Sequence, residues 1–183
     1  MAKYRRYRKY SRRSHAKWSP NIQEIATTTV TAPRNSTFYQ TFVLSFNPTQ
    51  VNTAVSQIYT VKRIECSFYI DSDIGTYPQD IEDVAAYIMF VPQGMNVTQN
   101  YNVQHPEYIM AYKFLGSPTF DTASSTSNVH GQQYQPTRVN TRLSRKLNSG
   151  DSVILFIKGN NTNESRDTTF DFHGLIRWWT KAN

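Results

Sequence analysis

Apolar and polar residues alternate along several short segments of the chain, with the period of two that is typical of β-strands. The alternation is clearest over residues 38–46, 64–70, 138–143 and 170–178, and it predicts strands with one buried side. The positions predicted to face the core are Phe38, Phe42, Leu44, Phe46, Ile64, Cys66, Phe68, Ile70, Val139, Thr141, Leu143, Phe170, Phe172, Ile176 and Trp178. Two further runs, Ala85–Val91 and Val153–Ile157, are apolar on both faces and predict central strands.

Turn residues separate these segments, for example Asn47-Pro48 and Asn148-Ser149-Gly150-Asp151. Only residues 51–58 and 106–114 suit short helices, and the polar stretch 116–135 predicts a long loop. Seven or eight strands of this kind predict an all-β sandwich, and the jelly roll is one such sandwich. A chain of 183 residues is about the size of one domain.

Charge divides the chain into two parts. The first seventeen residues carry eight basic side chains and no acidic one: Lys3, Arg5, Arg6, Arg8, Lys9, Arg12, Arg13 and Lys17. The other 166 residues carry 12 basic and 13 acidic side chains, a net charge of −1, although the whole chain has +7. We expect a basic arm over residues 1–20 that is disordered when free, and a folded domain over residues 21–183.

The arm combines cations with aromatic rings. Tyr4, Tyr7 and Tyr10 recur at every third position among the arginines, and Trp18 follows. Lysine and arginine bind phosphates with release of counterions, while flat rings stack on unpaired bases. This combination predicts contact with single-stranded nucleic acid through the eight cations and these four rings. Two other interpretations stay open, a tail that only aids solubility and a nuclear localisation signal, and the second is compatible with nucleic-acid binding.

A second basic group lies in the body: Arg138, Arg142, Arg145 and Lys146. We expect the first two to share a strand face and the others to begin the following turn. The group either extends the polyanion path onto the body or forms ion pairs with neighbouring subunits.

Catalytic patterns are weak in this sequence. The acidic residues between Asp71 and Asp83 fit an EF-hand loop poorly, because Thr76 stands where that loop needs glycine. Neither the four histidines nor Cys66 shows a metal-ligand spacing. We therefore expect no enzyme, no cofactor and no metal site, a structural role for His173, and a buried Cys66. The first residues suit no signal peptide, and the longest uninterrupted apolar run, residues 84–91, is too short for a membrane helix, so we expect a soluble protein.

Three stretches resemble the capsid proteins of circoviruses and related circular single-stranded DNA viruses. They are the arm Lys3–Arg13, the segment Tyr59–Tyr69 with its basic-apolar alternation and aromatic pair near a cysteine, and the aromatic-rich end Phe170–Lys181. The arm is shorter and less arginine-dense than in typical circoviruses, which places the chain among circovirus-like relatives.

The resemblance implies an eight-stranded jelly roll, with sixty copies in a T=1 shell and the arms inside. It also implies a packaged single-stranded DNA genome, a virion protein that enters the host nucleus, and contact with an import receptor. Sixty arms would neutralise about 480 nucleotides. Two alternatives remain at this point: the coat protein of a small satellite-type RNA virus, and a single-strand nucleic-acid-binding protein that forms no shell.

Overall fold

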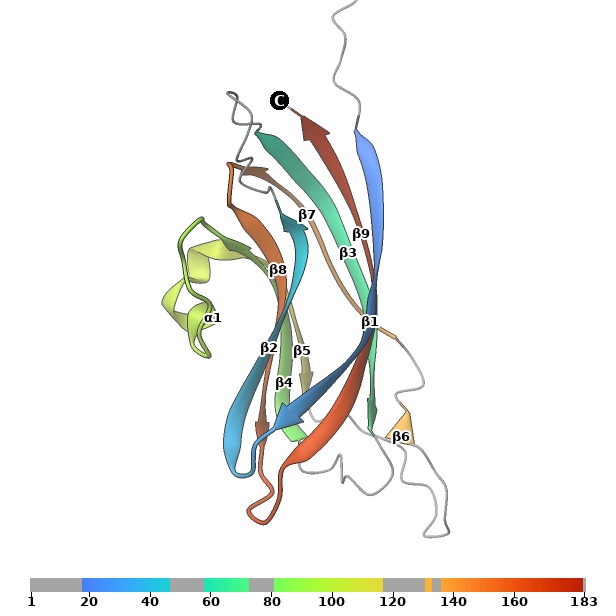
Figure 1. Cartoon of the computed structure of the whole chain (residues 1–183), viewed down its shortest axis with the longest axis vertical. Coiled ribbons are helices and arrows are strands. Elements are labelled where there is room, and N and C mark those ends of the chain that lie inside the picture. Colours follow the sequence, from blue (N-terminus) through green and yellow to red (C-terminus); the bar gives the residue numbers. More distant parts are fainter. Residues whose placement is uncertain (1–17, 47–57, 73–80, 117–130, 133–135, 183) are drawn as a thin grey trace, which may run out of the picture.

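The computed structural model describes residues 18–46, 58–72, 81–116, 131–132 and 136–182. The described part is almost entirely β-structure (Figure 1). Its strands are β1 (Ser19–Ala32), β2 (Ser36–Phe46), β3 (Tyr59–Ser72), β4 (Ile81–Val91), β5 (Ile109–Gly116), β6 (Gly131–Gln132), β7 (Thr137–Leu147), β8 (Ser152–Asn161) and β9 (Thr168–Ala182).

These strands form two antiparallel sheets. One has the order β1-β9-β3, after which β7 and the two-residue β6 both pair with β3; the other has the order β2-β8-β4-β5. Strands from the two halves of the chain pair in a nested way, β1 with β9, β2 with β8, β3 with β7 and β4 with β5. The chain thus folds back on itself like one long hairpin that is rolled into two layers, which is the eight-stranded jelly roll. This confirms the predicted fold class.

Apolar side chains fill the space between the sheets. Phe172 of β9 stacks on Phe42 of β2 with ring centroids 4.6 Å apart, and Phe68 of β3 contacts Phe172 at 5.0 Å. Phe38 and Phe170 meet edge to face at 5.5 Å, also across the two layers. All four predicted alternating segments contribute to this core, so the period of two correctly identified its main residues.

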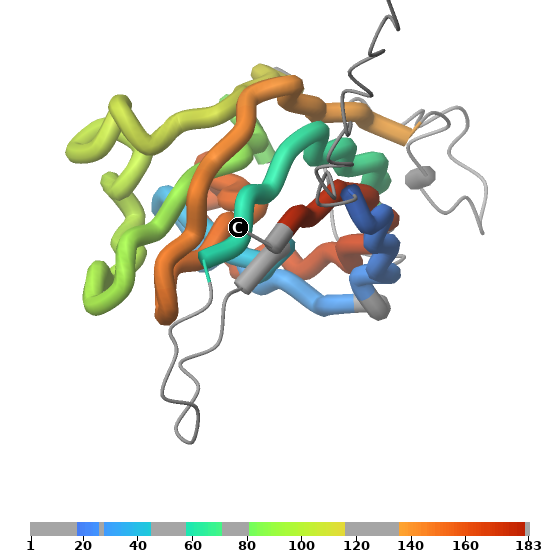
Figure 2. Tube along the Cα trace, turned by 90° about the horizontal axis from the view of Figure 1, so that it is seen from above, coloured from blue at the N-terminus to red at the C-terminus, as the bar shows by residue number. Residues whose placement is uncertain are grey.

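The two runs that are apolar on both faces, Ala85–Val91 and Val153–Ile157, lie in β4 and β8. Both of their faces are apolar because the outer face of the β2-β8-β4-β5 sheet is partly covered. The chain between β4 and β5 leaves the sandwich, forms helix α1 (Tyr101–Gln104) and the 3₁₀ turn η2 (Pro106–Tyr108), and packs back on the sheet (Figures 1 and 2). Tyr101 is fully buried there, against Met89 and Phe156 among others, and its hydroxyl donates a hydrogen bond of 3.2 Å to the Phe90 carbonyl. Burial raises the pKa of the Tyr101 phenol to about 12.

Irregularities in strand pairing explain most differences from the sequence prediction. The pairing register of β1 shifts between Ile25 and Thr28, so inward positions change from odd to even numbers and the strand shows no simple alternation. The sequence did not reveal β1 for this reason. A second shift opposite Arg63 leaves Leu143 58% exposed, although its position predicts burial.

The predicted helix over residues 106–114 is wrong beyond its first turn. Only Pro106–Tyr108 is helical, because the chain from Ile109 onward pairs with β4. Residues 51–57, most of the loop 116–135 and the arm lie outside the described residues. In the described part of the chain, no helix has the length and apolar character needed to cross a membrane.

Candidate nucleic-acid interface

The outer face of the β1-β9-β3-β7 sheet gathers basic side chains. Most of their positions alternate with core residues along β3, β7 and β9 and so point away from the sandwich, and the irregular pairing at Arg63 places the adjacent Lys62 and Arg63 both on this side. We define the basic face by these seven residues: Lys62, Arg63, Arg138, Arg142, Lys146, Arg177 and Lys181. In the pairing register the same outer face also holds three carboxylates, Glu24, Glu65 and Asp171, and Asp171 accepts a hydrogen bond of 2.7 Å from the Thr29 hydroxyl.

These seven cations form no ion pair within the described part of the chain. Other acidic side chains, such as Glu82, Asp83 and Asp167, lie at the opposite end of the sandwich, where β4 begins and where β8 leads into β9. Unpaired cations on one face raise the local potential and attract polyanions. The body is therefore electrically polarised, even though its net charge is near zero.

The arm joins the fold at this face. Trp18 is the first described residue, and its ring lies under the ammonium group of Lys62, 3.7 Å from Nζ. Lys62 pairs in register with Trp179 of β9, whose ring lies 4.7 Å from the guanidinium carbon of Arg177. Cations and indole rings thus lie side by side on β3 and β9, next to the start of β1. The exit of the arm is continuous with the basic face.

The second basic group predicted from the sequence is split by the structure. Arg138, Arg142 and Lys146 lie on the basic face, all exposed. Arg145 instead turns to the other side of β7, where its guanidinium carbon lies 4.3 Å from the ring centroid of Phe90. The expectation that Arg145 and Lys146 begin a turn is wrong, because β7 stays paired with β3 through Leu147.

Sequence reasoning missed four members of the basic face: Lys62, Arg63, Arg177 and Lys181. Arg177 stands at a polar position in a predicted strand, whereas Arg63 and Lys62 lie just before one predicted strand and Lys181 lies just after another. The order of the strands could not be predicted from the sequence, because β3 and β9 are about a hundred residues apart in the chain and become neighbours only in the folded sheet.

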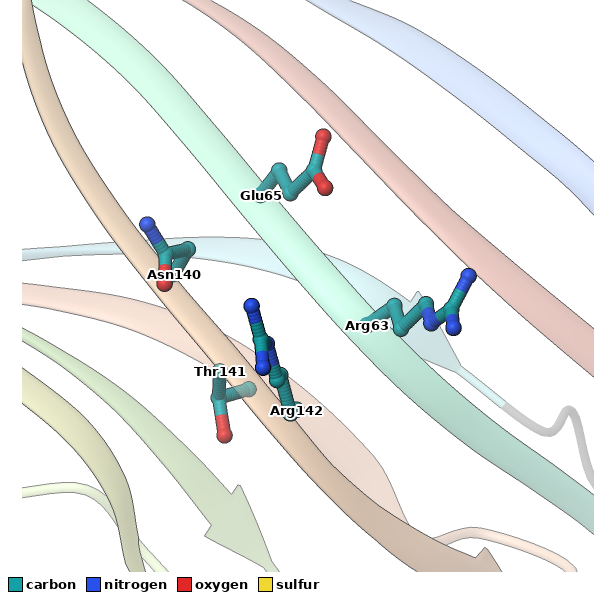
Figure 3. Close-up of a pocket in the computed structure, with 5 residues that line it drawn as sticks. All are labelled: Arg63, Glu65, Asn140, Thr141 and Arg142. Carbon is teal, nitrogen blue, oxygen red and sulfur yellow. The ribbon is translucent and has the colours of Figure 1, made fainter.

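Two adjoining hollows mark the basic face. The larger, of about 510 Å³, is lined by Arg63 and Glu65 of β3 and by Asn140, Thr141 and Arg142 of β7 (Figure 3). A second hollow of about 350 Å³ shares Glu65 and Asn140 and reaches Arg138 and Arg177. The two hollows together make a polar depression that runs across β7, β3 and β9.

Cys66 and His173 occupy structural positions in the same sheet. Cys66 is 2% exposed in the core, and burial raises the pKa of its thiol to about 12. The imidazole of His173 stacks on Tyr69 with ring centroids 4.7 Å apart. Both placements agree with the sequence prediction.

The strands that flank the acidic segment Asp71–Asp83 were also expected, while residues 73–80 lie outside the described residues.

The outer face of the other sheet carries an aromatic band. It consists of Tyr39 and Val43 of β2, Tyr87 of β4, and Tyr112 and Phe114 of β5. Tyr112 and Phe114 are 70% and 62% exposed, and they stand on β5, the edge strand of this sheet. Exposed apolar surface at an open sheet edge is typical of a protein–protein contact.

No family model matches the sequence. No curated protein matches it either. Among solved structures, the crystal structure of the decameric BFDV capsid protein aligns with a TM-score of 0.33 and 7% identity, covering 91% of this chain and 100% of that chain. The infectious bursal disease virus VP2 subviral particle aligns with a TM-score of 0.31 and 9% identity over 87% of this chain, which spans 32% of the VP2 chain.

Proposed function

We propose that this protein is a viral capsid subunit that self-assembles around a single-stranded nucleic acid. The observation that carries the proposal is the continuity between the arm and the basic face at Trp18. Jelly rolls build viral shells, lectins and cupins. Of these, only a shell that encloses a genome needs a long cationic arm joined to a nearly neutral body.

The proposed cargo is single-stranded DNA, held by the arm and by the basic face. Eight arm cations and seven face cations per subunit would neutralise about 900 nucleotides in a sixty-subunit T=1 shell. The tyrosines of the arm, with Trp18 and Trp179, offer rings on which unpaired bases stack. Assembly in the host nucleus, with the arm also serving as an import signal, belongs to the same proposal.

The aromatic band supports the self-association part of the proposal. Tyr112 and Phe114 project from the edge strand β5, so a neighbouring subunit that packs there buries apolar area and covers an open edge. A closed shell requires such contacts between different surfaces of identical copies.

Electron microscopy of the purified full-length chain tests the proposal. Negative-stain images should show uniform closed shells, and the shells should contain nuclease-protected DNA. Deletion of residues 1–17 removes eight cations but leaves the jelly roll complete, so shells should still form and most of the nucleic acid should be lost. A protein that stays monomeric at every salt concentration contradicts the capsid function, and protected RNA contradicts the DNA cargo.

A further inference from the structure

Glu65 lies where a surface for binding nucleic acid should have no carboxylate. It is exposed at the centre of the basic face, and it lines both hollows. Its strand neighbours are Asn140 of β7 and Arg177 of β9, but its carboxylate forms no ion pair with Arg177 or with any other described cation. An unpaired carboxylate repels phosphate, so its presence here calls for a ligand group that donates a hydrogen bond.

The hollow in front of Glu65 results from the irregular pairing of β3 and β7. Lys62 pairs with Ser144 but Ile64 pairs with Thr141, so two residues of β7 stand opposite Arg63. Arg63 has a φ of 49°, a backbone conformation that is uncommon for a residue with a side chain and that is often found at functional sites. Its side chain extends toward β9, whereas Arg142 rises from β7 beside Asn140, and the space between the two guanidinium groups stays open (Figure 3).

The groups around the hollow match the parts of an unpaired nucleotide. The two guanidinium groups suit the phosphates on either side of a base. The carboxylate of Glu65 accepts hydrogen bonds only, and the exocyclic amino groups of cytosine, adenine and guanine are donors. Thymine lacks this group, and its one remaining donor, N3–H, lies between two carbonyl oxygens that repel a carboxylate. The amide of Asn140 both donates and accepts, so it fits a neighbouring position on the edge of the base.

We propose that the hollow lined by Arg63, Glu65, Asn140 and Arg142 binds one base of the packaged strand and prefers a base with an exocyclic amino group. This inference rests on the proposed function, because it assumes that single-stranded nucleic acid reaches the basic face. Glu65 accepts the hydrogen bond from the amino group, and the two arginines hold the adjacent phosphates. The repulsion between Glu65 and the backbone is offset only when the base supplies that donor.

The test compares two pyrimidine oligonucleotides of equal length, oligo-dC and oligo-dT, by fluorescence anisotropy with the full-length protein at neutral pH. A hydrogen bond to a charged group predicts that oligo-dC binds about tenfold more tightly or better. Glu65→Ala should bring the ratio of the two affinities close to one and leave oligo-dT binding equal or stronger. Glu65→Gln keeps an acceptor oxygen and should give an intermediate ratio.

Glu24→Ala is the matched control. It removes the same charge from the same face, but Glu24 pairs with Leu175 and does not line the larger hollow, so the ratio should stay at the wild-type value. Because both glutamates are exposed, each variant should fold, and a thermal melt verifies this. Equal wild-type affinities for the two oligonucleotides, or a ratio that survives Glu65→Ala, overturn the inference and leave the capsid proposal standing. A full-length protein that binds neither oligonucleotide contradicts the proposed function itself.

Discussion

Replacing three cations of β7 tests whether nucleic acid follows the basic face. Arg138→Gln, Arg142→Gln and Lys146→Gln together remove three exposed charges that have no ion-pair partner in the described part of the chain. The fold should be unaffected, since all three side chains point away from the core. The salt slope is the slope of the logarithm of the binding constant against the logarithm of the salt concentration. If each cation neutralises one phosphate of a single strand, the steepness of this slope should decrease by about 0.7 per cation, or by about 2 in total.

The same slope predicts a loss of affinity for oligo-dT of about fifty-fold at 150 mM salt. Fluorescence anisotropy between 50 and 300 mM salt measures both quantities. A control variant with Arg34→Gln, Lys113→Gln and Lys158→Gln changes the net charge equally, but these residues lie in the β1–β2 turn and in the other sheet. Its salt slope should stay near the wild-type value.

Equal losses in the two triple variants would mean that only net charge matters, and the basic face would then be no binding path. The deletion of residues 1–17 provides an independent measurement. The body alone should retain a slope of up to about 5 from its seven face cations, and the β7 substitutions should lower that slope to about 3. A truncated body without any salt-dependent binding would place all the phosphate contacts in the arm.

Three further predictions concern assembly and stability. The double substitution Tyr112→Ser and Phe114→Ser should leave the thermal melt nearly unchanged, because both side chains are exposed, but should abolish shells in electron micrographs; intact shells would exclude this part of the aromatic band as a contact. Gly159→Ala should lower stability by about 1–3 kcal/mol, because its new Cβ would lie 2.8 Å from Phe38 Cζ and 3.0 Å from Val84 Cγ2. Gly174→Ala, whose nearest neighbour is the terminal methyl of Ile25 at 3.2 Å, should cost less in the same melt, and the opposite order would refute the packing argument. The Cys66 thiol has its pKa raised from 9.0 to about 12 in the fold, so unfolding releases a proton between these pH values and wild-type stability declines as pH rises through this window. The stability lost in Cys66→Ala at pH 8, measured by urea unfolding, should therefore shrink at pH 10, and a constant difference would contradict the raised pKa.

The fold class and most of the core could be predicted from the sequence alone. Strand residues such as Ile64, Phe68 and Phe172 alternate with polar positions, and one buried side is sufficient to produce that pattern. Two central runs correctly predicted strands covered on both faces, since burial on two sides leaves no polar position. The charge of the arm and its tyrosines was equally plain, because it is a property of composition and needs no fold.

Local irregularities were invisible in the sequence. The register shift in β1 moves inward positions from odd to even numbers after Ile25, and the shift opposite Arg63 turns Leu143 outward. Each shift is fixed by the pairing partner of the strand, so an alternation rule applied to one segment fails there.

Which cations share a surface depends on the folded arrangement of the strands. Arg63, Arg142 and Arg177 belong to three strands that are adjacent solely because the rolled hairpin places β3 between β7 and β9. The same pairing places Glu65 beside Asn140 and opens the hollow between them. The composition shows a basic arm on a nearly neutral body. The strand order separates the charges of that body into a basic face and a distant acidic end. This separation could not be predicted from the sequence, because pairing between remote segments depends on the whole chain and not on any local pattern.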